Sequence, residues 1–219
     1  MSALSLFGGT GFIGSHYAAL YPEGLTVEPR RLLVEGLYDD VLWMISTTSN
    51  YAPLGGDLHT DIDTNLKHPM RVLPDVKGTF TLTSSWFVWG SAAGQDASHP
   101  AREEDLCDPN GFYSVTAWAR EKLIRSHQQM VGRPYRILRL CNVIGNDPRA
   151  GKQKNALEYL FRRLARNEDI QIYEGENFRN FLHVEDVCRA IHLTITQGAP
   201  NTIYNIGARD SVRMIDLVE

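Results

Sequence analysis

Short apolar runs alternate along the chain with longer stretches of helical periodicity. Continuous apolar runs are typical of strands that are covered on both faces of a parallel sheet. The runs that predict strands are Ala3–Phe7, Leu25–Glu28, Val41–Ser46, Thr79–Thr83, Tyr135–Leu140 and Ile203–Ile206. Because helical segments separate these runs, the pattern predicts βαβ units and an α/β protein with a parallel sheet.

The helical segments are recognised by apolar residues that recur on one face. The clearest stripe, at the spacing i, i+3, i+4, i+7, is formed by Leu157, Leu160, Phe161 and Leu164. Helices are also predicted over Tyr113–Met130 and Val184–Thr196.

Two stretches, Gly90–Gly111 and Gly145–Lys154, are polar and irregular. A loop as long as the first of these is usually functional. The chain contains neither a repeat nor a low-complexity linker, so we expect a single domain over residues 1–219. A small, abbreviated substrate lobe is expected from about residues 145–178 and 208–219.

The first predicted strand runs directly into a glycine-rich turn and then into a helix. Gly8 permits the sharp turn, Gly11 lets the backbone approach a ligand, and Gly14 lets helix and strand pack closely. Free N–H groups at the helix start, near Phe12 and Ile13, suit a pyrophosphate. This context predicts a Rossmann-type, doubly wound parallel sheet that binds a dinucleotide.

The end of the second predicted strand bears on the choice between NAD and NADP. Glu28 lies where an acidic side chain holds the adenosine ribose hydroxyls of NAD. Arg30 and Arg31 follow it, and arginine at this place can instead receive the 2′-phosphate of NADP. The carboxylate favours NAD, and the arginines leave NADP open.

Composition narrows the functional class further. With 43% hydrophobic and 22% charged residues and a formal net charge of -4, the 219-residue chain has no general attraction to nucleic acid or to anionic membranes. Its three cysteines, Cys107, Cys141 and Cys188, are scattered without a CxxC pair or histidines at ligand spacing, which argues against disulfides and a metal site. The N-terminal segment has no basic region and only a short apolar run, so we expect a cytoplasmic protein.

Several motifs occur in an order that resembles a known family. They lie at Gly8–Gly14, Asp40–Ser46, Asp63–Asn65, Thr83–Gly90, Pro109–Tyr113, Arg139–Gly145, Phe178–Val187 and Tyr204–Gly207. Together they resemble the extended short-chain dehydrogenase/reductase family, in its NAD-dependent nucleotide-sugar epimerase/dehydratase branch.

The resemblance implies roles for individual residues. Ser85 and Tyr113 match the catalytic hydroxyl and the active-site tyrosine, while Thr47 and Tyr113 would border the nicotinamide. Asn142 and Arg179 match residues that contact the substrate, the arginine gripping the nucleotide diphosphate. A tyrosine with an ordinary pKa of about 10 needs help to exchange a proton at neutral pH.

The sequence also departs from the family pattern. The family places a lysine four residues after the active-site tyrosine, where this chain has Ala117. Arg120 and Lys122 lie on the same predicted helix, and we expect neither to replace that lysine. Trp86 and Phe87 fill the places of the Asp-Glu pair of the sugar 4,6-dehydratases, and aromatic rings cannot shuttle the protons of that reaction.

These observations leave three functions open. The first is epimerisation of a nucleotide-diphosphate sugar, by hydride exchange at a ring carbon. The second is reduction of a 4-keto-sugar nucleotide, and the third is dinucleotide binding without catalysis, because Ala117 replaces the lysine. The resemblance also implies a homodimer. The chain before Asp40 is short, so we expect part of the adenine-side wall to be missing.

Overall fold

The computed structural model describes residues 3–29, 37–47, 58–90, 101–147, 156–170 and 178–217. Arg30, predicted to lie near a cofactor, falls outside these ranges. None of the helices within them is both long and apolar enough to cross a lipid bilayer.

A six-stranded parallel sheet forms the centre of the fold, with the strand order β2-β1-β3-β4-β5-β9. Its strands are β1 (Leu4–Phe7), β2 (Leu25–Glu28), β3 (Asp40–Trp43), β4 (Phe80–Ser85), β5 (Tyr135–Leu140) and β9 (Thr202–Ile206). Each of the predicted apolar runs therefore forms a strand, and the Rossmann-type parallel architecture is confirmed.

The third strand is shorter than the apolar run that predicts it: β3 ends at Trp43, whereas the run continues to Ser46. The backbone carbonyl of Ile45 accepts hydrogen bonds from the Trp43 indole at 3.0 Å and from the Arg120 guanidinium at 3.0 Å. Side-chain donors thus satisfy this carbonyl where a neighbouring strand otherwise would.

The strand order reverses direction between β1 and β3. The chain moves from β1 outward to β2, then crosses back to place β3 on the other side of β1. Ligands of open α/β sheets bind outside the carboxyl ends of the strands at such a switch point. Within the described residues β2 is the edge strand of this sheet.

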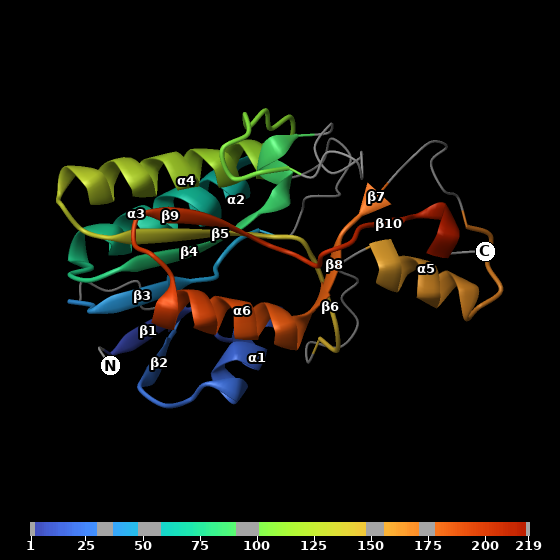
Figure 1. The fold of residues 1–219 in the computed structure, drawn as a ribbon, viewed down its shortest axis with the longest axis horizontal. Coiled ribbons are helices and arrows are strands. Elements are labelled where there is room, and N and C mark those ends of the chain that lie inside the picture. The colour runs from blue at the N-terminus through green and yellow to red at the C-terminus, as the bar shows by residue number, and fades with distance from the viewer. Residues whose placement is uncertain are drawn as a thin grey trace.

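Helices cover both faces of the sheet (Figure 1). One face carries α2 (Leu58–Asp61), the π-helical turn η1 (Ile62–Lys67), α3 (His68–Val72), the 3-10 turn η2 (Leu73–Asp75) and α4 (Phe112–Met130). The other face carries α1 (Phe12–Leu20) and α6 (Val184–Gln197). The resemblance places the start of a helix at Asp63–Asn65; these residues lie within η1, which follows α2 directly.

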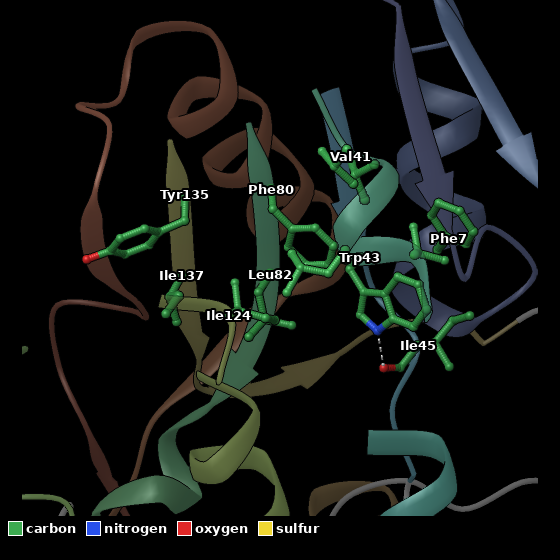
Figure 2. Close-up of a cluster of buried hydrophobic side chains, with 12 residues drawn as sticks. Phe7, Val41, Trp43, Ile45, Phe80, Leu82, Ile124, Tyr135 and Ile137 are labelled. Carbon is green, nitrogen blue, oxygen red and sulfur yellow. Dashed lines mark hydrogen bonds between the residues drawn. The ribbon is translucent and has the colours of Figure 1, made fainter. Parts of the chain in front are cut away.

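Successive side chains of each strand point to opposite faces of the sheet, so the core consists of two layers. Figure 2 shows the layer beneath α4, in which Trp43 stacks on Phe7 with ring centroids 4.9 Å apart and Ile124 of α4 packs against the sheet. The opposite layer joins Leu6 and Leu42 to the buried faces of α1 and α6. Both layers anchor the strand ends that face the switch point.

Small elements extend the chain beyond the carboxyl ends of the strands (Figure 1). They are the 3-10 turn η3 (Trp86–Trp89), β6 (Asn142–Ile144), α5 (Ala156–Leu164), β7 (Phe178–Arg179), β8 (Phe181–His183), β10 (Val212–Arg213) and the 3-10 turn η4 (Ile215–Leu217). β6 pairs with β8 in parallel and β7 with β10 antiparallel, so residues from distant parts of the sequence meet beside the sheet. The division of the chain into a main domain and a substrate lobe stays a prediction.

Candidate active site

The turn between β1 and α1 is closed by glycines. Gly8 has a φ of +99°, a left-handed conformation that side chains rarely adopt, and its carbonyl accepts a hydrogen bond from the Gly11 N–H at 2.9 Å. A Cβ on Gly14 would lie 2.2 Å from the Gly8 oxygen. Only glycine fits there, so the first turn of α1 packs directly on the end of β1, as the spacing predicts.

A cleft of about 490 Å³ opens at this turn. It brings together most of the predicted site residues: Gly8, Gly11, Phe12, Ile13, Gly14, Glu28, Thr47, Ser85, Tyr113 and Asn142. Its walls come from the ends of β1 to β4 and from the start of α4, segments far apart in sequence. A backbone cradle at the N-terminus of α1 fits a pyrophosphate, so these residues suit a dinucleotide.

Glu28 closes the cleft at the end of β2. Its carboxylate accepts a hydrogen bond from the Ser5 hydroxyl at 2.9 Å, and the parallel register places it beside Phe7 at the end of β1. A carboxylate fixed in this way can accept hydrogen bonds from a vicinal diol and repels a phosphate.

Asn65 fixes the next part of the wall, although its side chain is fully buried. Its amide donates to the hydroxyls of Thr47 and Thr116, each at 2.9 Å, and its oxygen accepts from the Thr47 N–H at 3.0 Å. Thr116 lies on α4, so Asn65 ties the chain after β3 to the helix that carries Tyr113. It lies in the π-helical turn η1, and such turns often occur at functional sites.

Ser85 and Tyr113 face the cleft from β4 and from the first turn of α4. The Ser85 oxygen accepts a hydrogen bond from the Phe87 N–H at 3.3 Å, so its own proton stays available to another acceptor. The Phe87 ring stands edge-on to the Tyr113 ring, with centroids 6.0 Å apart. The backbone and this ring contact therefore orient both hydroxyl groups.

A second cavity, of about 230 Å³, adjoins the cleft. Trp86, Cys141 and Asn142 line both. Arg179, the predicted diphosphate ligand, lies in this second cavity, with its guanidinium 5.4 Å from the centre of the Trp86 ring. Burial raises the pKa of the Cys141 thiol to about 11, so it stays protonated at neutral pH.

The sequence matches a model of the NAD dependent epimerase/dehydratase family over residues 43–207. The chain belongs to this family.

Individual members of the family are distant in sequence. The chain is 25% identical to the low-salt glycan biosynthesis protein Agl12 of Haloferax volcanii over 97% of its own length and 79% of that protein. It is 24% identical to a dTDP-D-glucose 4,6-dehydratase of Dictyostelium discoideum, a match that covers 64% of the chain and 33% of that enzyme. The fold is similar to the crystal structure of UDP-glucuronic acid 4-epimerase from Bacillus cereus in complex with NAD, with a TM-score of 0.81, 18% identity and coverage of 98% and 80% of the two chains.

A buried ion pair supports the site of this family member from behind, and sequence reasoning missed it. Arg139 of β5 pairs with Glu121 of α4 at 2.9 Å, and their side chains are 4% and 2% exposed. The Ser84 hydroxyl donates to the same carboxylate, and the Arg139 guanidinium stacks 4.9 Å from the Trp89 ring centre. A signal was present, since charged residues in a predicted buried strand and on its covering helix need partners.

We expect the change Arg139→Met to lower the free energy of unfolding by about 3–5 kcal/mol, because it strands the buried Glu121 carboxylate. Urea denaturation measures this loss. The double variant Arg139→Met with Glu121→Met is the control and should recover most of it, since both charges leave together. If the double variant were as unstable as the single one, the loss would come from packing and not from the unpaired charge.

Proposed function

We propose that the protein is an enzyme that binds NAD in the cleft and epimerises a nucleotide-diphosphate sugar. One observation carries this proposal: the glycine cradle, Ser85 and Tyr113 line one cleft, and that cleft adjoins the cavity of Arg179. A dinucleotide and a diphosphate-bearing substrate would thus meet beside the two hydroxyl groups.

The residues that would hold the dinucleotide follow the cleft from one end to the other. Gly8, Gly11 and Gly14 would receive the pyrophosphate, Glu28 the adenosine ribose, and Thr47 the nicotinamide side. When bound, the nicotinamide supplies a reversible hydride acceptor for a ring carbon of the sugar. We favour NAD over NADP because the Ser5-bound carboxylate of Glu28 would repel a 2′-phosphate.

Tyr113 would exchange the proton of the reacting sugar hydroxyl. Its phenol lines the cleft at the start of α4, and Ser85 lines the same cleft from β4. The Ser85 hydroxyl does not use its own proton in the bond to the Phe87 N–H. It would donate that proton in a hydrogen bond to the same sugar oxygen and orient it toward Tyr113. In the return step the same phenol would give the proton back to the sugar oxygen.

Arg179 and Asn142 would hold the substrate. The guanidinium is a planar fork whose paired N–H groups match phosphate oxygens. We expect Arg179→Lys to raise the KM for a nucleotide sugar roughly 10-fold or more, since one bidentate charged contact is lost. Steady-state kinetics measure it, with an unchanged dinucleotide Kd as the control, because Arg179 lines only the neighbouring cavity.

Trp86 and Phe87 distinguish this proposal from dehydration. The rings stack with centroids 4.2 Å apart, and both line the cleft, where they offer neither proton donor nor acceptor beyond the indole N–H. A 4-keto-sugar reductase is the second candidate, because it would use the same hydroxyl groups with an exchangeable dinucleotide.

The test incubates purified protein with UDP-, GDP- and dTDP-sugars and follows the products by chromatography and mass spectrometry. An isomer of unchanged mass, formed without added dinucleotide, supports epimerisation. Net oxidation of added NADH or NADPH would identify a reductase, and a product lighter by one water a dehydratase. Sugar binding without turnover would identify a non-catalytic member and overturn the proposal.

We also propose that two copies of the chain form a homodimer through α4. Large apolar side chains stay exposed along this helix, at Phe112, Val115, Leu123 and Met130. A homodimer packed on α4 would cover them. Sedimentation velocity of the purified protein tests this pairing, with a monomer at micromolar concentration as the opposing result.

A further inference from the structure

Arg120 is the largest charged side chain that α4 buries completely. Its guanidinium donates from Nη1 to the Ile45 carbonyl at 3.0 Å and from Nη2 to the Thr83 carbonyl at 3.4 Å. Its Nε–H is buried without a hydrogen-bond partner in the part of the chain that the structure describes. These carbonyls lie where β3 and β4 end, so the cation stands under the floor of the cleft.

The guanidinium lies on the same side of α4 as the tyrosine. Tyr113, Ala117 and Arg120 follow each other at i, i+4 and i+7, which is one face of a helix. Long helical side chains lean toward the N-terminus of their helix, and Tyr113 lies at that end of α4. Ala117, which lies between them in the sequence, is fully buried and packs in a cluster with Val88 and Trp89.

The charge of Arg120 is not neutralised by a carboxylate of its own. Burial lowers the pKa of Arg120, and the Tyr113 phenol and the Glu121 carboxylate oppose this effect. Glu121 is engaged by Arg139 and Ser84, so its charge is already balanced. A buried cation without a dedicated anion costs several kcal/mol, and the anion of Tyr113 would offset that cost during proton exchange.

Other charged groups near α4 do not take this place. The charged or titratable side chains on the strands and helices packed against α4 are His59, Asp61, Asp63, Lys67, Tyr135, Arg136 and Arg139. Asp63 pairs with Lys67 at 2.6 Å in solvent, and Arg136 donates to the Gly198 carbonyl. Among the described groups, Tyr113 and Glu121 are the ones that act on the pKa of Arg120.

We propose that Arg120 is the positioning cation of Tyr113, supplied from one turn further along α4 than the lysine that the family pattern has at position 117. Its charge lies beneath the cleft that Tyr113 lines, where it would stabilise negative charge on the tyrosine oxygen during proton exchange, and its hydrogen bonds hold the ends of β3 and β4 around the cleft. This inference rests on the proposed use of Tyr113 in proton exchange. The expectation that Arg120 would not replace the lysine is therefore one that the proposal reverses.

The first experiment compares Arg120→Met with Arg120→Lys. Methionine keeps an unbranched side chain without the charge, while lysine keeps the charge. We expect the acidic limb of the kcat–pH profile to move upward by about one pH unit in Arg120→Met, which is about 10-fold in kcat below the limb. Arg120→Lys should restore most of the wild-type profile. An unmoved limb in a folded Arg120→Met protein would overturn the proposal.

A spectroscopic measurement separates this inference from the proposed function, because it needs no turnover. Tyrosine labelled with ¹³C at Cζ reports the ionisation of each phenol, and Tyr113→Phe assigns the Tyr113 signal. In Arg120→Met the Tyr113 signal should titrate at a pH about one unit higher than in the wild type. Absence of turnover together with this shift would overturn the epimerase and leave the Arg120 inference standing. Turnover together with an unshifted Tyr113 signal would support the epimerase and overturn the Arg120 inference.

A charge relocation completes the test. Moving the cation to the family position, by Ala117→Lys combined with Arg120→Ala, should return the Tyr113 titration to within about half a unit of the wild type. Ala117→Lys alone should raise neither kcat nor affinity, because two cations would then share one buried space. A gain in kcat from Ala117→Lys alone would show that the wild-type site lacks a cation, and would overturn the proposal.

Discussion

Gly14→Ala is expected to lower the affinity for NAD on the order of 100-fold, which is about the contribution of one or two hydrogen bonds to a charged group. The added Cβ would lie 2.2 Å from the Gly8 oxygen and 2.9 Å from the Gly9 Cα. Both neighbours are backbone atoms, so neither can move aside as a flexible side chain would. The first turn of α1 must separate from the end of β1, and the N–H groups that would receive the pyrophosphate separate with it.

The same change should also lower the free energy of unfolding, by about 1–3 kcal/mol for an overpacked site. Gly24→Ala is the matched control. Gly24 has a φ of +69° and open space around its Cβ position, so alanine costs about 1–2 kcal/mol of backbone strain there. Gly24 lies before β2, at the opposite end of the sheet from the cleft, so NAD affinity should be unchanged. Equal affinity losses in both variants, measured by titration calorimetry, would show that general destabilisation explains the result.

The fold could be predicted because the inner strands β1, β3, β4 and β5 are largely buried and alternate along the chain with helical segments. Tyr135–Leu140 has the same bounds in the sequence pattern and in the structure. Strand ends were harder to predict where a tertiary contact decides them. β3 stops at Trp43 although apolar residues continue, and two residues further on the Ile45 carbonyl accepts hydrogen bonds from Arg120 and from the Trp43 indole. An apolar run carries no record of such donors.

The glycine cradle was predictable for a different reason: its chemistry is local. Gly8, Gly11 and Gly14 act through their own backbone within one turn, so their spacing alone indicates the geometry. Ser85 and Tyr113 come from distant segments, and their common place in the cleft was expected only through the family resemblance. The structure shows that they line one cavity, whereas their roles in the reaction stay a proposal.

The polar interior could not be predicted from spacing. A helical pattern places Arg120 and Glu121 next to each other, yet the two side chains have different partners, the strand-end carbonyls and Arg139. Asn65 lies in one of the motifs of the family resemblance, but its bonds to Thr47 and Thr116 could not be predicted. Which polar groups meet depends on how α4 lies across the sheet, a long-range arrangement that one sequence does not encode in any local pattern.

Tyr113→Phe is expected to lower kcat by roughly 100- to 10,000-fold, the range that a positioned general acid–base group contributes. The phenylalanine ring keeps the edge-on contact with Phe87 and the helix start at Phe112, so the cleft keeps its shape. NAD affinity and the KM for the sugar should therefore stay within a few-fold of the wild type. Stopped-flow or steady-state turnover measures kcat, and calorimetry measures the affinity.

Tyr204→Phe is the control for the loss of a tyrosine hydroxyl as such. Its hydroxyl donates to the Ala199 carbonyl at 3.4 Å in an exposed position outside both cavities, so kcat should be unaffected. The Tyr113 hydroxyl has no described hydrogen bond, so its removal should not weaken the fold. The pair of variants therefore separates the loss of proton exchange from a loss of binding. If Tyr113→Phe kept more than about a tenth of the wild-type kcat, the contribution of the Tyr113 hydroxyl would lie below the range for general acid–base catalysis. The proton would then pass through another group, and Arg120 would have no phenolate to stabilise.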